Sequence, residues 1–420
     1  MAQLAGTEIT RQAIFLIEAG KMRPSMRTLK MIAARTGKPV EFFIDGPSGR
    51  LAADEMANDP RVDQLQALCL QQQFGDAIEL AVQLLNERLP RRVEAHVRHY
   101  AGQAFVRSSR PDEGLEQLRR AQVLLEAEPD PWLAVECADW EASALYLKED
   151  ERALAVAENA LRLCRLTSPR LPGTEARILE HIGAIHVKNH DFDRAVACYE
   201  QALEAAGAVR DLARVSRTYH GLSIAYQERG EISRAIEFTH KALALYALEN
   251  DNALLARGEN ELGLLLMKQG QVARAEATFR SALEHFDQSG TQPAKSHVLL
   301  SLAELFLRTG RLDEGVDTAD TAINLARELG EVMAESTGHQ LLGQLHERGG
   351  KPQLADKAFA TAIRVLKEHH LRARLAEVHA SYAEVLEARG ESRRAARHWK
   401  DAALHALPAR DLGTPRAGAR

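Results

Sequence analysis

Small residues recur along most of the chain with a period of 40 residues. The anchor positions of this repeat are Ala195, Ala235, Ala275, Gly315, Ala355 and Ala395. Twelve residues before each anchor stand Gly183, Ser223, Gly263, Ala303, Gly343 and Ala383, and seven residues after each anchor stand Ala202, Ala242, Ala282, Ala322, Ala362 and Ala402. Five residues before most anchors stand Gly230, Gly270, Gly310, Gly350 and Gly390. With apolar residues at helical spacing on both sides of that glycine, the pattern predicts two helices joined by a glycine turn.

Weaker copies of the pattern continue upstream. Gly102, Phe105, Gly114 and Ala121 match residues of a later repeat at a constant offset, and Ala153 with Ala160 marks another copy. The extended pattern predicts about nine helical hairpins over residues 61–407. The fold class is therefore all-α, with the hairpins stacked as an α-solenoid. Residues 408–420 contain Pro, Gly and isolated arginines without periodicity and are predicted to form a disordered tail.

The repeat resembles the tetratricopeptide repeat. The resemblance is carried by the small positions and by the bulky residues between them, namely Tyr226, Leu266, Phe306, Tyr199, Phe279, Phe359 and Trp399. It implies a right-handed solenoid whose concave wall is formed mainly by the first helix of each hairpin. Such surfaces bind peptides or partner helices.

The resemblance also indicates which side chains face the groove. The expected groove residues are Arg177, Arg217, His220, Gln227, Arg257, Asn260, Leu264 and Lys268. The three arginines occupy one position in three successive repeats and would form a positive stripe for carboxylates of a peptide or an acidic partner. An amide such as Asn260 can both donate to and accept from an extended peptide backbone. Surface arginines near helix starts are also common without a ligand, and Asn260 could simply face water.

Composition agrees with a helical core built from small residues, because aromatic residues make up only 5% of the chain and hydrophobic residues 45%. No apolar run is long enough for a membrane span or a signal peptide, so we expect a cytoplasmic protein without membrane contact. The cysteines, Cys69, Cys137, Cys164 and Cys198, are far apart and are expected to be reduced, packed thiols.

Charge is distributed unevenly along the chain. Residues 1–50 carry a net charge of +4, whereas the remaining 370 residues carry −9. A small basic segment joined to a mildly acidic body suggests that the first segment lies near a polyanion.

The sequence pattern over residues 4–46 predicts a compact unit of short helices. Thr10 is suited to cap a helix that runs to Ala19, Gly20 ends it, and Ser25 caps the next helix. This spacing resembles the helix-turn-helix of the Cro and lambda-repressor family, also called the xenobiotic-response-element (XRE) family. The resemblance implies a DNA-binding recognition helix that begins at Thr10. Its expected DNA contacts are Thr10, Arg11, Gln12, Leu16, Lys21 and Arg23.

Within that set, Arg11 could bind guanine and Gln12 adenine, while Lys21, Arg23 and Thr10 would contact phosphates. Leu16 departs from the polar residue often found there and could contact a thymine methyl. The family's first helix is missing ahead of Thr10. The true start could lie upstream, the head could be a remnant, or another element could cover it. The expected domains are a helix-turn-helix over 1–46, a linker over 47–60, and the solenoid.

No enzyme motif is present in the sequence. There is no glycine-rich phosphate loop, nucleophile elbow or metal-spaced cluster, so we expect no catalytic residues, no cofactor and no metal. Two histidine pairs have helical spacing, His186 with His190 and His96 with His99, but neither has further ligands at a recognisable spacing. For His186, a position in the packed core is the favoured interpretation.

Two functional hypotheses follow. The first is a homodimeric transcriptional regulator whose head binds DNA and whose repeats bind a regulatory peptide or protein, similar in layout to the RRNPP-type quorum-sensing regulators. The alternative is a protein-protein interaction scaffold with a vestigial helix-turn-helix.

Overall fold

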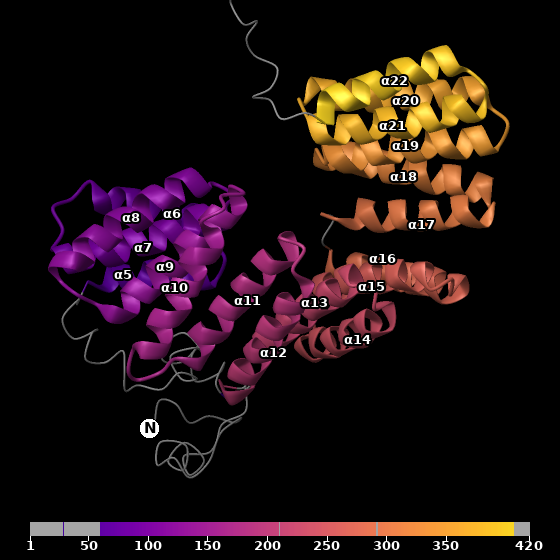
Figure 1. The fold of residues 1–420 in the computed structure, drawn as a ribbon. Helices are drawn as coiled ribbons and strands as arrows, with labels where there is room; N and C mark the ends of the chain where they lie inside the picture. The colour runs from indigo at the N-terminus through magenta and orange to yellow at the C-terminus, as the bar shows by residue number, and fades with distance from the viewer. Residues whose placement is uncertain (1–27, 29–58, 210, 291–292, 407–420) are drawn as a thin grey trace, which may run out of the picture. The chain divides into compact units, whose positions relative to one another are not determined.

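The computed structural model describes residues 28, 59–209, 211–290 and 293–406. The described ranges contain 18 helices and no strand (Figure 1). The chain divides into two compact units, Met1–Phe238 (unit 1) and Thr239–Arg420 (unit 2), and the division falls within α14 (Ile232–Glu249). Each unit is described by itself.

The helices of unit 1 before α14 are α5 (Pro60–Leu70), α6 (Phe74–Leu85), α7 (Arg91–Arg107), α8 (Pro111–Ala127), α9 (Pro131–Leu147), α10 (Ala153–Leu166), α11 (Pro172–Lys188), α12 (Phe192–Val209) and α13 (Leu212–Glu228). Those of unit 2 after α14 are α15 (Asn252–Lys268), α16 (Val272–Ser289), α17 (Lys295–Thr309), α18 (Leu312–Leu329), α19 (Val332–Arg348), α20 (Pro352–Glu368), α21 (Arg372–Ala388) and α22 (Ser392–Ala406).

Consecutive helices pair as hairpins, from α5 with α6 to α21 with α22. Within each unit the second helix of a hairpin also packs against the first helix of the next. The predictions of an all-α fold and of about nine stacked hairpins are confirmed. The expected DNA contacts Thr10, Arg11, Gln12, Leu16, Lys21 and Arg23 lie outside the described residues, as do residues 47–58 of the linker and the tail over 408–420. None of the described helices combines the length and apolarity needed to cross a membrane.

Local sequence sets where the helices start and stop. Asp130, Asp211 and Asp251 each cap a first helix, and their side chains accept hydrogen bonds from backbone N–H groups of the first turn. The glycine five residues before an anchor takes a left-handed conformation, as at Gly270 with φ of 75°. His190 takes the same conformation, with φ of 59°, at the equivalent place in the hairpin of α11 and α12. The turn therefore requires the left-handed conformation that glycine adopts most easily.

The two helices of a hairpin cross at the small residue twelve positions before the anchor. A Cβ added to Gly263 would lie 2.4 Å from Cε1 of Phe279, and one added to Gly343 would lie 2.6 Å from Cε2 of Phe359. Both phenylalanines are fully buried. Each glycine thus leaves the space that an aromatic ring on the second helix fills.

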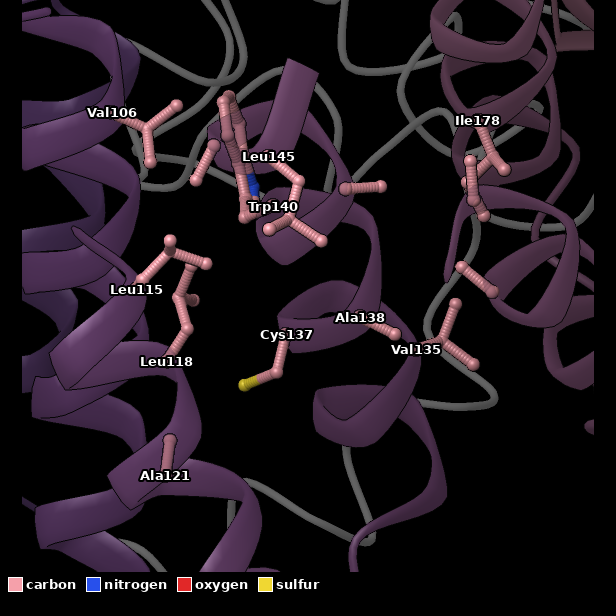
Figure 2. Close-up of a cluster of buried hydrophobic side chains, with 14 of the residues drawn as sticks. Val106, Leu115, Leu118, Ala121, Val135, Cys137, Ala138, Trp140, Leu145 and Ile178 are labelled. Carbon is pink, nitrogen blue, oxygen red and sulfur yellow. The ribbon is translucent and has the colours of Figure 1, made fainter. Parts of the chain in front are cut away.

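An apolar cluster of buried side chains joins α7, α8, α9, α10 and α11 in unit 1, and Figure 2 shows part of it around α9. Helix α9 contributes Val135, Cys137, Ala138, Trp140 and Leu145; Val106, Leu115, Leu118 and Ala121 come from α7 and α8; and Ile178 comes from α11. Side chains of α9 therefore pack against both the preceding and the following hairpin. That double contact joins separate hairpins into one unit.

Gly263→Ala is expected to lower the free energy of unfolding by about 1–3 kcal/mol, because the added methyl group overlaps the Phe279 ring. Gly207→Ala is the control, since nothing lies within 4 Å of a Cβ added in that helix. It should stabilise by about 0.5–1 kcal/mol. Denaturant unfolding followed by circular dichroism measures both. A Gly263→Ala protein as stable as the parent would contradict the packing argument, and the cost should disappear in a Phe279→Ala background.

Candidate functional site: the inner wall

The first helices of consecutive hairpins lie against one another. In unit 1 these contacts join α5, α7, α9, α11 and α13 in order, and in unit 2 they join α15, α17, α19 and α21. Contacts of that extent do not form between consecutive second helices in the sets α6, α8, α10, α12 and α16, α18, α20, α22. Because the first helices approach more closely, the concave face of each unit runs along them. This face, called the inner wall below, contains the predicted groove residues.

A buried ionic network lies on the inner wall where α9 meets α11. Arg177 donates from Nε to Oδ2 of Asp139 over 2.7 Å and from Nη2 to Oε2 of Glu136 over 2.6 Å. Nδ1 of His181 lies 2.7 Å from the other oxygen of Asp139. The Asp139 side chain is 0% exposed, and the Arg177 guanidinium also lies 5.8 Å from the centre of the Trp140 ring. Arg177 is thus held between two carboxylates and does not offer a free positive charge.

These contacts shift the ionisation of both partners. Burial alone would raise the pKa of Asp139, but the charges and hydrogen bonds of His181 and Arg177 outweigh it and hold that pKa far below its usual range. Burial would lower the pKa of Arg177, and the carboxylates of Glu136 and Asp139 raise it instead. Asp139 and Arg177 therefore both remain ionised around neutral pH.

A second polar cluster joins α11 to α13. Glu180 accepts hydrogen bonds from Oγ1 of Thr218 over 2.6 Å and from Nη1 of Arg214 over 3.1 Å. Arg214 also pairs with Asp211, the residue that caps α13. The charge of Glu180 is thereby compensated by Arg214.

Arg217 differs from Arg177 because it is exposed and no described carboxylate pairs with it. It lies on α13, and its charge lies close enough to Arg107 at the end of α7 to affect the ionisation of that residue. Burial and the like charge of Arg217 both lower the pKa of Arg107. The Arg107 guanidinium stands 5.4 Å from the centre of the Phe74 ring. Arg107 and Arg217 are thus two exposed like charges carried by separate hairpins of unit 1.

Two further predicted residues belong to the same wall of unit 1. His220 is half-buried, and Gln227 donates from its amide to Glu228 over 3.2 Å.

The predicted residues of unit 2 share one face of α15. Arg257 and Lys268 are exposed, and Leu264 is half-buried. Oδ1 of Asn260 is buried and accepts no hydrogen bond. A buried amide oxygen without a donor is costly, and a ligand N–H would remove that cost. Since Arg257 is in unit 2 and Arg177 and Arg217 are in unit 1, the alignment of all three in one stripe stays a prediction.

The histidine pairs noted in the sequence do not converge on shared ligands. His186 is buried and lies 3.8 Å from Asp191, while the His190 ring contacts Phe192 edge-on. His99 faces the Cys137 thiol, and His96 lies 3.8 Å from Asp130. A core position for His186 fits its burial.

The four cysteines are free, as expected from the sequence. Cys69, Cys137 and Cys164 are buried, and Cys198 is half-buried. Burial raises the pKa of Cys69 to about 12, so its thiol stays protonated.

A hollow of about 460 Å³ lies in unit 2, outside the predicted site. It is lined by His297, Glu331, Val332, Met333, Ala334, His369 and Leu371. The carboxylate of Glu331 accepts hydrogen bonds from the backbone of Ala294 and the hydroxyl of Ser296. The Glu331 carboxylate therefore binds the N-terminal end of α17.

Sequence reasoning missed Glu136, Asp139 and His181. Asp139 lies 38 residues before Arg177, and Glu180 lies 38 residues before Thr218. The sequence signal for these contacts was an acidic residue on a first helix, followed 38 residues later by a side chain that can donate a hydrogen bond to it.

The described helices form paired hairpins like those of tetratricopeptide repeats, stacked as a solenoid. Residues 174–247 and 254–328 match the tetratricopeptide repeat family. Among curated proteins, the 43 kDa receptor-associated protein of the synapse from Tetronarce californica is 22% identical over 221 residues. That match covers 52% of this chain, and the chain spans about half, 53%, of that relative.

Three solved structures share the fold at low identity. The apo form of RapI superposes with a TM-score of 0.63 at 12% identity, over 82% of this chain and 96% of RapI. The apo quorum sensor NprR from B. thuringiensis gives 0.62 at 13% identity, over 84% of this chain and 100% of NprR. The Rap conjugation gene regulator in complex with the Phr peptide gives 0.50 at 14% identity, over 82% and 94%. The expectation that this chain is not an enzyme stays a prediction.

Asp139→Asn is expected to lower the free energy of unfolding of unit 1 by about 3 kcal/mol, because it leaves Arg177 and His181 without their shared charge. The pKa of Asp139 is depressed in the folded state, so its contribution is present above the unfolded value of about 4 and is lost as the pH falls below it. The difference between parent and variant should therefore begin to shrink near pH 4 and keep shrinking as the pH falls toward the much lower folded-state pKa.

Urea unfolding followed by the fluorescence of Trp132 and Trp140, both on α9, reports this difference. Asp112→Asn is the matched control, because Asp112 is 74% exposed and pairs only at the surface. It should change stability by less than about 0.5 kcal/mol. Equal stability of the Asp139 and Asp112 variants would refute a structural role for the network.

Proposed function

We propose that the inner wall binds a peptide or an extended segment of a partner protein, so that the chain acts as a protein-protein interaction module. The observation that carries the proposal is Arg217, an exposed guanidinium without a described carboxylate partner. A carboxylate placed there would form charge-assisted hydrogen bonds with it. An acidic side chain or the C-terminal carboxylate of a peptide supplies that group.

Asn260 supports the same proposal in unit 2. Its buried Oδ1 has no donor, and the backbone N–H of an extended peptide is the donor that such an amide accepts. Exposed Arg257 and Lys268 and half-buried Leu264 on the same helix face would add charge and apolar contact. The Rap regulator that was solved with the Phr peptide shares this fold, which favours a peptide as the ligand class.

Arg217→Glu is expected to weaken peptide binding by about 10-fold to 100-fold, because it replaces an attractive charge with a repulsive one at the inner wall. The probe is a peptide selected by the full chain from a random library with free C-terminal carboxylates, labelled and measured by fluorescence anisotropy. Arg162→Glu is the control with the same charge change. Arg162 is exposed on α10, a second helix, and bonds Asn159 within its own helix.

The control protein should bind with unchanged affinity. Two outcomes count against the proposal: selection that enriches no peptide, and an Arg217→Glu protein that binds as tightly as the parent.

We also propose a regulatory role in which the residues before the repeats bind DNA, with the chain acting as a homodimer. The support is the net charge of +4 over residues 1–50 and the spacing from Thr10 to Gly37 that resembles the Cro family. A quorum sensor, NprR, shares the fold of the repeats. In such a regulator, a ligand on the wall would rotate successive hairpins and reset the spacing of two heads relative to half-sites about 34 Å apart.

Arg11→Ala with Gln12→Ala is expected to abolish preference for a selected operator while leaving weaker, salt-dependent binding to other DNA, because base contacts specify and phosphate contacts position. Selection from random duplexes followed by binding titrations at two salt concentrations measures both. Circular dichroism checks that the repeats of the double variant remain helical. If the parent protein shows no salt-dependent DNA binding, the regulatory proposal is wrong and only the peptide-binding proposal remains.

A further inference from the structure

Two histidines and an aspartate gather between the helices of the α21–α22 hairpin in unit 2. His379 lies on α21, and His398 and Asp401 lie on α22. Nδ1 of His379 is 2.8 Å from Nδ1 of His398 and 4.0 Å from Oδ2 of Asp401. One potential ligand atom from each of the three side chains lies within 4.8 Å of the others. The cluster is separate from the inner-wall residues discussed above.

The helix repeat explains why these groups meet. His398, Asp401 and His405 are three and then four residues apart, so they lie along one face of α22. That face packs against α21, where His379 is only 2% exposed. The rings of His379 and His405 are stacked with centroids 6.0 Å apart. Antiparallel packing of two helices therefore brings four polar side chains into one partly buried layer.

Hydrogen bonding in this layer is incomplete. Nε2 of His379 and Nδ1 of His405 are buried and have no hydrogen-bond partner. The remaining nitrogen of His379 faces the Nδ1 of another imidazole, so that contact uses a lone pair on one ring and a proton on the other. An ion held between the Nδ1 atoms of His379 and His398 would not contact these two atoms, but it would replace the close contact between the two imidazole nitrogens with metal ligation.

Burial favours the neutral form of His379 and of His398. Burial, assisted by the charges of Lys367 and the neighbouring histidines, lowers the pKa of His379 to about 4. Burial also lowers the pKa of His398, with Arg394 and Lys367 acting in the same direction. Asp401 opposes these effects at both rings. Arg394 is itself paired with Glu391 and Asp356, which reduces its repulsion of a cation.

We propose that His379, His398 and Asp401 form a binding site for a divalent transition-metal ion, with zinc as the best match. Two imidazole nitrogens and one carboxylate oxygen form a ligand set that zinc prefers, whereas Ca²⁺ and Mg²⁺ require oxygen ligands. Tetrahedral zinc at 2.0–2.1 Å from each nitrogen would hold the two nitrogens about 3.3 Å apart. The present separation is 2.8 Å, so the two side chains would have to move apart by about 0.5 Å to hold the ion. A water molecule would complete the fourth position.

A metal held this way would connect α21 to α22 across their hairpin. Because the ion would bind the folded hairpin and not the unfolded chain, it would stabilise unit 2 by an amount that rises with the logarithm of its free concentration above the Kd.

The test uses the full chain, freed of metal by a chelator and then titrated with Zn²⁺ in equilibrium dialysis and with Co²⁺ in visible absorption. The parent is expected to bind one ion that is lost, with at least a 10-fold fall in affinity, in His398→Gln and in Asp401→Asn. Both residues are only partly buried, so these variants should fold. His369→Gln is the control, since His369 is exposed at the end of α20 and lies outside the cluster.

In the parent and the control, Co²⁺ should give the absorption of a tetrahedral nitrogen and oxygen site, and Zn²⁺ should raise the Tm of unit 2. Neither signal should appear in the two cluster variants, while their circular dichroism matches that of the parent. Identical stoichiometry and affinity in parent, cluster variants and control would overturn the proposal and assign any binding to other histidines. Peptide and DNA binding are measured independently, so this result does not depend on theirs.

Discussion

The close approach of the two helices where they cross in each hairpin is the constraint on which the rest of the structure depends. Where the second helix carries an aromatic ring, as at Phe279 or Phe359, the first helix carries glycine. In the hairpin of α17 and α18, the equivalent positions are Ala303 and Ala319, both fully buried. The two kinds of pair differ in combined side-chain volume, so the crossing is filled by different residues in different hairpins. What they share is a small residue on the first helix, which allows the two helices to pack closely.

Stacking in turn determines where polar groups lie. Contacts between first helices of neighbouring hairpins join residues 37 or 38 positions apart, such as Thr174 with Glu136 in unit 1 and Gln344 with Ser381 in unit 2. Such contacts satisfy buried polar atoms and also fix the register of one hairpin against the next. The inner wall is consequently a sequence of nearest-neighbour interfaces, and a charge remains available to a ligand only where the adjacent hairpin offers no partner.

This explains how far the sequence could predict the site. The period of small residues was sufficient for the helices, the turns and the number of hairpins, because each depends on local spacing. The ion pairs of Arg177 were not predictable in the same way. Its partners Glu136 and Asp139 belong to the preceding hairpin, and whether they contact Arg177 depends on how the two hairpins are aligned. His379 and His398 are 19 residues apart on facing helices, a separation that no short metal motif contains. The residues expected to bind DNA lie outside the part of the chain that the structure describes.

The like charges of Arg107 and Arg217 have a consequence for how a ligand would act on unit 1. Arg107 lies on α7 and Arg217 on α13, so the two residues belong to hairpins that are not adjacent along the chain. In a solenoid, contacts otherwise join each hairpin to its neighbours. An anion that contacted both arginines would therefore connect two hairpins that are not neighbours in the chain.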